Sequence, residues 1–336
     1  MSEEGMVDFF EGREKTVRVY FTVPECCSLL DLETDIWEEL LKQTGCSIIG
    51  ELRHKEVTAF ILSESSLFVW RDHILLKTCG TTTPLLLLPL LNRQLGWLEG
   101  YEWFSYSNGA LLKPGLQPSG YRSNEELEQQ ITHTLLDLTS STDGSKSSLS
   151  FSDGSFEFVS QKPTKYNSPT HTVVEIKLIN LQECGQFYLA SDSTAIDKMF
   201  SDLFREPWET DHFHFEPCGF SLNALHPERK ESYATIHVTP ELGFSYVSFE
   251  TNHLNELRSQ VKKLCSLFCP RQVIVTAQYP VLPLCLRERG GKFSGSGDVI
   301  MDLLPGIECE RQYFEEHFEE DLKIVSYKLN LPRVHW

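Results

Sequence analysis

The spacing of apolar residues predicts a chain that alternates between strands and a few helices. Residues 16–21 alternate between apolar and polar side chains, as in a half-buried strand, whereas the apolar residues of 31–43 recur on one face of a helix that ends before Gly45. Short turns between the strands that follow favour antiparallel neighbours. The remaining elements predicted for this half are strands at 47–51, 57–62, 66–70, 73–78 and 101–107 and helices at 83–98 and 123–138.

The second half of the chain repeats this order of elements. The serine-rich residues 140–160 predict a hairpin around Asp153-Gly154, with a disordered linker as the alternative. Two halves of one plan, at about 1–160 and 165–336, are therefore expected, although their sequences share no evident identity. The predicted elements are strands at 171–180, 185–190, 212–220, 232–239, 243–250 and 271–278 and helices at 194–205 and 253–267.

The tail from Arg289 onward gives no clear pattern. Its glycine-rich residues 290–297 lack the strand and the Lys-Ser/Thr pair that frame a phosphate-binding loop, so a flexible loop is predicted.

Composition narrows the classes of protein that remain. A length of 336 residues with 40% hydrophobic content permits a large core, in one domain or two. The net charge of −18 argues against nucleic acid or a membrane as partner, because anionic surfaces attract clustered Lys and Arg. The acidic start and the short apolar runs predict a cytoplasmic protein without a signal peptide or a membrane span.

The ten cysteines form no C-x-x-C pair, which is typical of neither a disulfide framework nor a structural zinc site. Cys265 and Cys269 could share a metal from one helix, but no second pair of ligands accompanies them. We therefore expect no metal.

One polar stretch stands out between apolar runs. The runs 57–62 and 67–70 flank Ser63-Glu64-Ser65-Ser66, and a third run ends at Cys79. Each unsatisfied polar group buried in a sheet costs about 1–3 kcal/mol, so these groups are either carefully bonded or used in chemistry. A hydroxyl-rich edge strand is the simpler interpretation of the stretch by itself.

The stretch is one of six motifs that occur in order between residues 10 and 251. Together they resemble the eukaryotic S-adenosylmethionine decarboxylases. The resemblance implies an α+β fold, a four-layer αββα sandwich of two antiparallel sheets with outer helices, formed as a single domain from the two related halves. The motifs are Phe10-Glu11-Gly12-x-Glu14-Lys15, Leu62-Ser63-Glu64-Ser65-Ser66-x-Phe68-Val69, Lys77-Thr78-Cys79-Gly80-Thr81-Thr82, Phe215-x-Pro217-Cys218-Gly219-Phe220-Ser221-x-Asn223, Ile236-His237-Val238-Thr239-Pro240-Glu241 and Phe244-Ser245-Tyr246-Val247-Ser248-Phe249-Glu250-Thr251.

The resemblance also implies self-cleavage. A decarboxylase needs a carbonyl group as an electron sink, and this family makes a covalent pyruvoyl group from its own serine. By resemblance, Ser65 attacks the carbonyl of Glu64, His237 is the base for elimination of the resulting ester, and Ser221 holds that ester. The chain then becomes residues 1–64 and 65–336. Without the motif, His237 would be interpreted as a core histidine.

The same resemblance implies which residues act in the decarboxylation reaction. The pyruvoyl group forms a Schiff base with S-adenosylmethionine, Cys79 returns a proton to the substrate carbon, and Glu11 and Glu14 belong to the catalytic set. A thiol of ordinary pKa is protonated at neutral pH, as a proton donor must be. The alternative for Cys79 is a small buried side chain.

Substrate binding is implied for five residues. Phe10 and Phe215 would enclose the adenine near the sulfonium, whose charge favours aromatic faces. Glu241 would bind the ribose hydroxyls, and the backbones of Leu62 and Glu64 would bind the base edge. Both phenylalanines could instead be core residues.

A candidate regulatory site follows from a departure from the family pattern. Animal-type members are activated by putrescine at an acidic site, and Glu175 and Glu250 match two of its carboxylates. Arg18 stands where that pattern has a glutamate, and His171 stands where it has an aspartate; Lys77 is the fifth candidate. Because added cations would repel a diamine, little stimulation by putrescine is predicted. The alternative is that Arg18 faces solvent.

The implied function is production of decarboxylated S-adenosylmethionine for spermidine and spermine synthesis, with a homodimer as an open prediction. Two alternatives remain. A catalytically silent relative, acting as a regulatory subunit, would be expected to lack one of the four residues Ser65, Cys79, Ser221 and His237, and all four are present. A nucleoside-binding protein would never cut its own chain.

Overall fold

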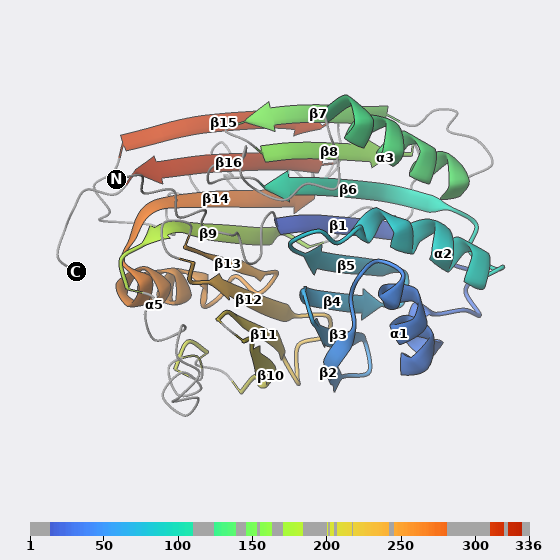
Figure 1. The fold of residues 1–336 in the computed structure, drawn as a ribbon, viewed down its shortest axis with the longest axis horizontal. Helices are drawn as coiled ribbons and strands as arrows, with labels where there is room; N and C mark the ends of the chain where they lie inside the picture. Colours follow the sequence, from blue (N-terminus) through green and yellow to red (C-terminus); the bar gives the residue numbers. More distant parts are fainter. Residues whose placement is uncertain are drawn as a thin grey trace, which may run out of the picture. The chain divides into compact units, whose positions relative to one another are not determined.

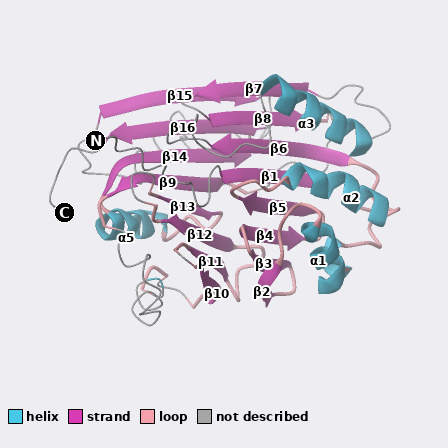
Figure 2. Cartoon of the chain, in the orientation of Figure 1, coloured by secondary structure: helices cyan, strands magenta, loops and turns pink. Residues whose placement is uncertain are grey.

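The computed structural model describes residues 14–109, 124–138, 146–152, 155–162, 171–183, 200, 202–204, 207–216, 218–241, 245–280, 310–318 and 322–330. The chain divides into two compact units. The first comprises residues 1–48 and 62–163, and the second comprises residues 49–61 and 164–336. A short piece of the N-terminal half, 49–61, therefore packs with the C-terminal half. Figure 2 shows strands and a few helices throughout the described chain. That both halves form one domain stays a prediction.

The N-terminal half contributes an eight-stranded sheet with strand order β2-β3-β4-β5-β1-β6-β8-β7. Its strands are β1 (Glu14–Phe21), β2 (Ile48–Arg53), β3 (Val57–Leu62), β4 (Ser65–Trp70), β5 (His73–Thr78), β6 (Tyr101–Gly109), β7 (Lys146–Ser152) and β8 (Ser155–Gln161). Its helices are η1 (Leu29–Asp31), α1 (Thr34–Lys42), η2 (Pro84–Leu86), α2 (Leu87–Gln94) and α3 (Asn124–Leu138). In Figure 1 the three α-helices follow one another along one side of this sheet.

The C-terminal half contributes a second eight-stranded sheet with strand order β10-β11-β12-β13-β9-β14-β16-β15. Its strands are β9 (Val173–Leu181), β10 (Glu209–His214), β11 (Phe220–Leu225), β12 (Tyr233–Thr239), β13 (Tyr246–Thr251), β14 (Pro270–Pro280), β15 (Glu310–Phe318) and β16 (Leu322–Asn330), with helix α5 (Leu257–Phe268) after β13. The two strand orders correspond position by position, with β1 matching β9. An α+β fold with two antiparallel sheets of one plan is thus confirmed.

The second sheet has two buried faces of different character. One face is apolar and packs against α5 through Leu257, Val261, Leu264, Cys265 and Phe268, forming the core of this unit. The opposite face carries polar side chains, because the strands alternate in period two. Its buried polar residues are Ser221, Asn223, Thr235, His237, Ser248 and Glu250. A buried polar face of this kind is typical of a site rather than of a core.

Two of the element predictions were wrong. The single strand predicted at 212–220 is two strands, β10 and β11, joined by a turn in which the Phe215 N–H donates to Gly219 O at 3.0 Å. Gly219, immediately before β11, adopts a φ of +112°, which is strained for other residues. The helix predicted at 83–98 begins with a 3₁₀ turn and ends at Gln94.

The tail contains strands that the sequence pattern did not reveal. β15 and β16 pair with each other, and β16 extends the sheet from β14. The hairpin predicted within residues 140–160 is present as β7 and β8. Four predictions lie outside the described residues: the turn at 153–154, the strand 185–190, most of the helix 194–205 and the loop 290–297. Within the part of the chain that is described, no helix is both long and apolar enough to cross a membrane.

Candidate functional site

Ser65 begins β4 in a strained backbone conformation. Its φ is +146°, a region occupied almost only by glycine, and the residue is buried. The preceding turn is held in place because the Ser63 N–H donates to Ser47 O at 2.8 Å, while Ser63 Oγ accepts from the Ser47 N–H at 3.1 Å. Such strain costs about 1–3 kcal/mol and persists only where surrounding contacts impose it. The backbone of Ser65, immediately after the Glu64 carbonyl, is therefore strained.

Two donors from Cys79 converge on the carbonyl oxygen of Glu64. The Cys79 N–H donates to this oxygen at 3.2 Å, and its Sγ lies 3.3 Å away as a second donor. Pairing of Ser65 with Thr78 across β4 and β5 brings the two segments together. Donors aimed at a carbonyl oxygen stabilise negative charge when that carbonyl is attacked, as in an oxyanion hole.

The Glu64 side chain lies beside the same thiol. Cys79 Sγ is also 3.5 Å from Glu64 Oε2, so its single proton is shared between the carbonyl oxygen, which is nearer, and the carboxyl oxygen. Burial raises the pKa of the Glu64 carboxyl, and the Cys79 hydrogen bond and the Lys15 charge oppose that effect.

Lys15 anchors the loop that follows β5. Its buried ammonium donates to Gly80 O at 2.7 Å, to Thr82 O at 2.6 Å and to Thr82 Oγ1 at 3.2 Å. Thr82 Oγ1 in turn lies 2.7 Å from Cys79 O. Lys15 thus positions Cys79, a role that the sequence reasoning missed. The signal available was a lysine beside a glutamate at the start of a strand, within the first of the six motifs.

Glu14 and Lys77 form a buried ion pair, with Lys77 Nζ 3.5 Å from Glu14 Oε1. The structure therefore brings the candidate regulatory residue Lys77 to a predicted catalytic carboxylate. Arg18 lies four residues after Glu14 on β1. Its side chain is partly buried, and its Nε is shielded from solvent. Phe10 and Glu11 lie outside the described residues.

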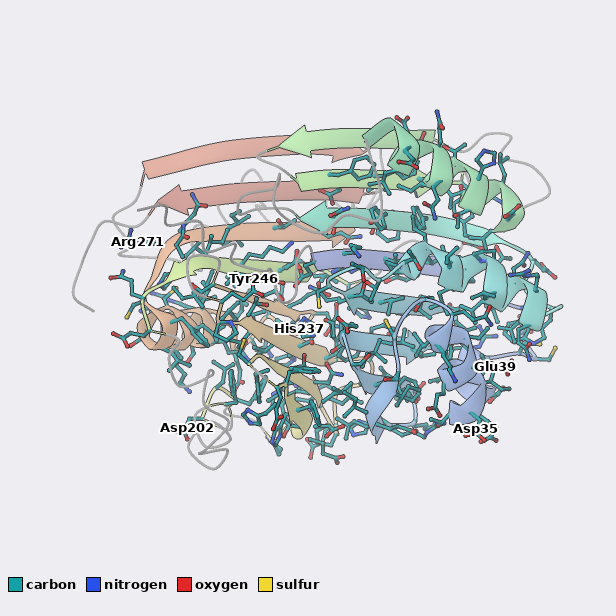
Figure 3. The ribbon with its side chains drawn as sticks, viewed as in Figure 1. Asp35, Glu39, Asp202, His237, Tyr246 and Arg271 are labelled. Carbon is teal, nitrogen blue, oxygen red and sulfur yellow. The ribbon has the colours of Figure 1, made fainter. Side chains whose placement is uncertain are left out.

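In the second unit, Ser221, His237 and Ser248 lie directly opposite one another on β11, β12 and β13. All three are buried on the polar face of the sheet. Figure 3 labels His237 on β12. The structure thus brings the two predicted processing residues, Ser221 and His237, together on neighbouring strands.

Each ring nitrogen of His237 lies within hydrogen-bonding distance of a hydroxyl group. Its Nε2 lies 3.3 Å from Thr235 Oγ1, and its Nδ1 lies 3.5 Å from Ser248 Oγ. Thr235 Oγ1 donates to Asn223 Oδ1 at 3.0 Å, and Asn223 Nδ2 donates to Phe60 O at 3.0 Å. Phe60 belongs to the 49–61 segment of the same unit. Sequence reasoning had not assigned a role to Thr235 or Asn223.

Two acidic residues of the candidate regulatory site are neighbours. Glu175 on β9 lies directly opposite Glu250 on β13. Glu250 is fully buried and accepts a hydrogen bond from the Tyr233 hydroxyl at 2.6 Å, while Lys177 Nζ lies 3.3 Å from Glu175 Oε2. Lys177 was missed by the sequence reasoning, although its period-two spacing from Glu175 indicated a shared face.

His171 is not brought to these acids. Its side chain is 56% exposed and pairs with Glu231, with Nε2 and Oε2 3.3 Å apart. That hydrogen bond raises the pKa of the His171 imidazole. The structure thus places His171 in a surface ion pair.

The predicted substrate-binding residues fall in both units. Leu62 and Glu64 belong to the first unit, whereas Phe215 and Glu241 belong to the second. Phe215 is partly buried in the turn after β10, where its ring meets that of Phe213 edge to face at 5.0 Å. Glu241 is buried just after β12.

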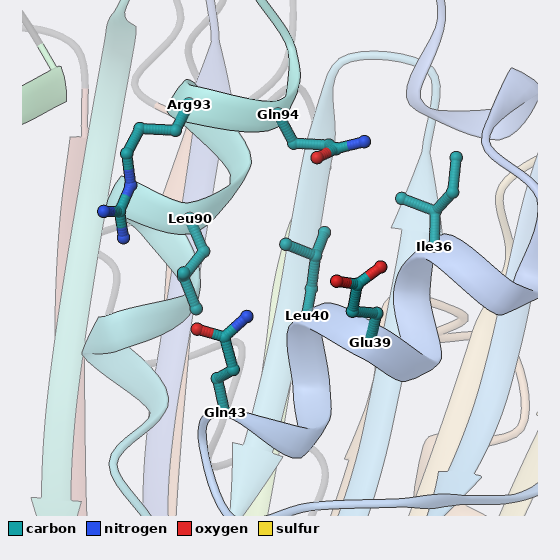
Figure 4. A pocket seen from close by; sticks show the side chains of 7 residues that line it. All are labelled: Ile36, Glu39, Leu40, Gln43, Leu90, Arg93 and Gln94. Atoms are coloured by element: carbon teal, nitrogen blue, oxygen red, sulfur yellow. The ribbon is translucent and has the colours of Figure 1, made fainter.

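A shallow hollow lies elsewhere, between α1 and α2 (Figure 4). Both polar and apolar side chains line it, and none of the predicted site residues is among them. Its lining consists of Ile36, Glu39, Leu40, Gln43, Leu90, Arg93 and Gln94.

Comparison with known proteins identifies relatives over most of the chain. The model of the Adenosylmethionine decarboxylase family matches residues 7–282. The S-adenosylmethionine decarboxylase proenzyme of Xenopus laevis is 32% identical over 289 residues, which cover 82% of this chain and 84% of the relative. Proenzyme 1 of Arabidopsis thaliana is 30% identical over 341 residues, covering 93% of this chain and 86% of the relative.

A solved structure, the AdoMetDC-delta26 monomer of Trypanosoma brucei, shares the fold. The match has a TM-score of 0.59 at 18% identity and covers 79% of this chain and 99% of that chain. At this identity the match shows the fold alone, and the family is shown by the sequence matches. The chain therefore belongs to the adenosylmethionine decarboxylase family.

Proposed function

We propose that this chain is a self-processing S-adenosylmethionine decarboxylase, whose product supplies spermidine and spermine synthesis. One observation supports the proposal above all others: the strained Ser65 follows a carbonyl that Cys79 holds with two donors. An inert hairpin gains nothing from this arrangement, whereas an acyl shift needs both a strained peptide and a stabilised oxyanion.

Processing begins when Ser65 Oγ attacks the carbonyl carbon of Glu64. The carbonyl oxygen gains negative charge, which the Cys79 N–H and thiol stabilise. The carbon–nitrogen bond then breaks, the amine takes up a proton, and Glu64 is left as an ester on Ser65 Oγ. Relief of the strain at Ser65 favours this step.

His237 then acts as a general base and removes the α-proton of residue 65. The bond between Cβ and Oγ breaks, the Glu64 carboxylate leaves with the electron pair, and the chain is divided into residues 1–64 and 65–336. Water converts the new terminus to a ketone and releases ammonia. Ser221, opposite His237 on β11, holds the ester before elimination.

The residues around Ser65 fit a prosthetic group made from this serine, because no separate binding cradle is needed. A pyruvoyl group supplies an electrophilic carbonyl that accepts electrons as carbon dioxide leaves. Cys79 then provides the proton for the substrate carbon, and Lys15 keeps its loop in place. The ion pair with Lys77 holds the Glu14 carboxylate in place. Glu11 is proposed as the second carboxylate of the catalytic set.

Substrate recognition completes the proposal. Phe10 and Phe215 enclose the adenine, Glu241 binds the ribose, and the backbones of Leu62 and Glu64 bind the base edge. The partial burial of Phe215 supports this role, since an aromatic face must remain accessible to stack.

Regulation is proposed to rest on cations that the chain itself carries. Lys177 forms an ion pair with Glu175, which lies opposite the buried Glu250. One ammonium group therefore already neutralises part of the charge of the two acids. Arg18 is proposed to add to this from the first unit, in place of a bound diamine. Cytoplasmic location and a homodimer remain predictions from the sequence.

The mass of the purified protein tests the processing step. We expect two chains, residues 1–64 with a free carboxylate and residues 65–336 with a blocked, ketone-bearing terminus. A single chain of 38.6 kDa, or an ordinary serine amine at residue 65, would disprove self-processing. Decarboxylation is tested separately, by measuring the release of labelled carbon dioxide from S-adenosylmethionine that carries the label in its carboxyl group.

A further inference from the structure

We propose that Asn223 and Thr235 are positioning residues that fix His237 in one tautomer, with the proton on Nε2 and the basic lone pair on Nδ1. This inference rests on the proposed function, in which His237 is the processing base. It goes beyond that function, because it names the reacting nitrogen and the groups that select it.

The backbone carbonyl oxygen of Phe60 can only accept a hydrogen bond. The atom of Asn223 that lies 3.0 Å from this oxygen must therefore be the amide nitrogen. Its amide oxygen then faces Thr235, at 3.0 Å from Oγ1. An amide oxygen has no proton to give, so Thr235 must donate.

A threonine hydroxyl has a single proton, and that of Thr235 is used on Asn223. Toward His237, Thr235 Oγ1 can therefore act only as an acceptor. The His237 atom that lies 3.3 Å from it is Nε2, which must carry a proton. In a neutral imidazole the other nitrogen then holds the lone pair.

That other nitrogen, Nδ1, faces Ser248 Oγ at 3.5 Å, and a hydroxyl can donate to it. When Nδ1 accepts a proton, the Nε2–H···Thr235 hydrogen bond remains and strengthens, because the donor becomes charged. The line of hydrogen bonds thus selects the base before the reaction and stabilises its protonated form afterwards.

Phe60, the first residue in this series of hydrogen bonds, also suggests why the 49–61 segment packs with the second unit. Phe60 lies in β3, within the 49–61 segment that packs with the second unit. The same segment is tied to that unit by an ion pair between Lys230 and Glu56 at 3.5 Å and by the contact of His54 with Glu209 at 3.0 Å. These two contacts help to hold in place the segment whose carbonyl orients Asn223.

Two separate experiments measure the tautomer of His237 and the rate of self-cleavage. Nitrogen-15 NMR of histidine-labelled Ser65→Ala protein, which stays in one chain, reports which ring nitrogen carries hydrogen, and a His237→Gln spectrum identifies the signals of His237. We expect hydrogen on Nε2, and we expect the Nδ1–H form to appear when Thr235→Val is added. Hydrogen on Nδ1 in the Ser65→Ala protein would overturn the proposal.

Processing rates are then compared in chains that retain Ser65. Thr235→Val should slow self-cleavage by at least about tenfold, since a histidine in the wrong tautomer is a poor base, and Thr235→Ser should restore most of the rate. Thr251→Val is the matched control, because it removes a buried hydroxyl that bonds Tyr233 O at 2.6 Å on the neighbouring strand. It should process normally.

The two claims fail in different ways. If Nε2 carries hydrogen and Thr235→Val shifts it while cleavage keeps its normal rate, the tautomer assignment stands and the role of His237 as base is wrong. If Thr235→Val and Thr235→Ser slow cleavage equally and leave the tautomer unchanged, the positioning role is overturned.

Discussion

The Cys79 N–H donates to Glu64 O at 3.2 Å, across a gap of fifteen residues in the sequence. This contact links the residue proposed to protonate the substrate with the peptide bond proposed to break. One residue thus serves both reactions, first through its backbone and thiol together and later through its thiol alone. The contact also makes the two roles separable by mutation.

Cys79→Ala should still cut its chain, more slowly, because the backbone donor to Glu64 O survives the change. Decarboxylation should fall by about 100-fold or more, since a general acid contributes roughly 10² to 10⁴. Gel analysis over time and carbon dioxide release measure the two rates. Unchanged turnover would remove Cys79 from the proposed mechanism.

Ser65→Gly should be more stable than Ser65→Ala, although both remain uncut. The φ of +146° suits glycine and strains alanine, a difference of about 1 kcal/mol or more in the free energy of unfolding. Urea denaturation of the two purified proteins measures it. Equal stability would mean that no strain resides at this residue.

Lys15→Met should destabilise the fold by about 3 kcal/mol or more, because three buried oxygens lose their shared donor at about 1–3 kcal/mol each. Self-cleavage should slow as the Cys79 loop loosens. Lys263→Met serves as the control, since Lys263 bonds the Asp202 carbonyl at an exposed position. The free energy of unfolding, measured in a Ser65→Ala background, should be unaffected by that second change.

Putrescine should stimulate neither processing nor decarboxylation appreciably, since Lys177 already pairs with Glu175. Lys177→Met removes this ammonium and should make both rates respond to millimolar diamine. The rates are measured with and without putrescine in each protein. Several-fold activation of the unmodified protein would contradict the proposal for both Lys177 and Arg18.

The His171–Glu231 pair should make stability depend on pH near neutrality. Because the folded-state pKa of His171 is raised above its ordinary value of 6.5, its contribution is fully present below 6.5 and is lost as pH rises through the folded-state pKa. The effect should stay under about 1 kcal/mol, since the pair is exposed. Urea denaturation across this range should give a flatter profile for His171→Gln.

The same variant tests the candidate regulatory site. A surface ion pair has no reason to influence chemistry, so His171→Gln should process and decarboxylate at normal rates. A changed response to putrescine would return His171 to the regulatory set.

Local pattern predicted many of the secondary elements, because period-two alternation is a property of neighbouring residues. The strand at 57–62 matches β3, and that at 73–78 matches β5. The prediction failed at 212–220, where β10 ends at His214 and β11 begins at Phe220. The polar and turn-forming residues Glu216, Pro217 and Gly219 between the two strands were the sequence signal for this break.

The amino-acid sequence by itself determined the family, the fold class and the identity of the candidate residues, since these depend on residue types in a fixed order. Only the tertiary structure decided which of them meet. Long-range strand register sets Ser221 opposite His237 and Asn223 opposite Thr235, and it brings Glu250 opposite Glu175. The strained φ of Ser65 is likewise invisible in sequence, because a serine in a β-prone run is expected to be extended and only the contacts around it impose another conformation.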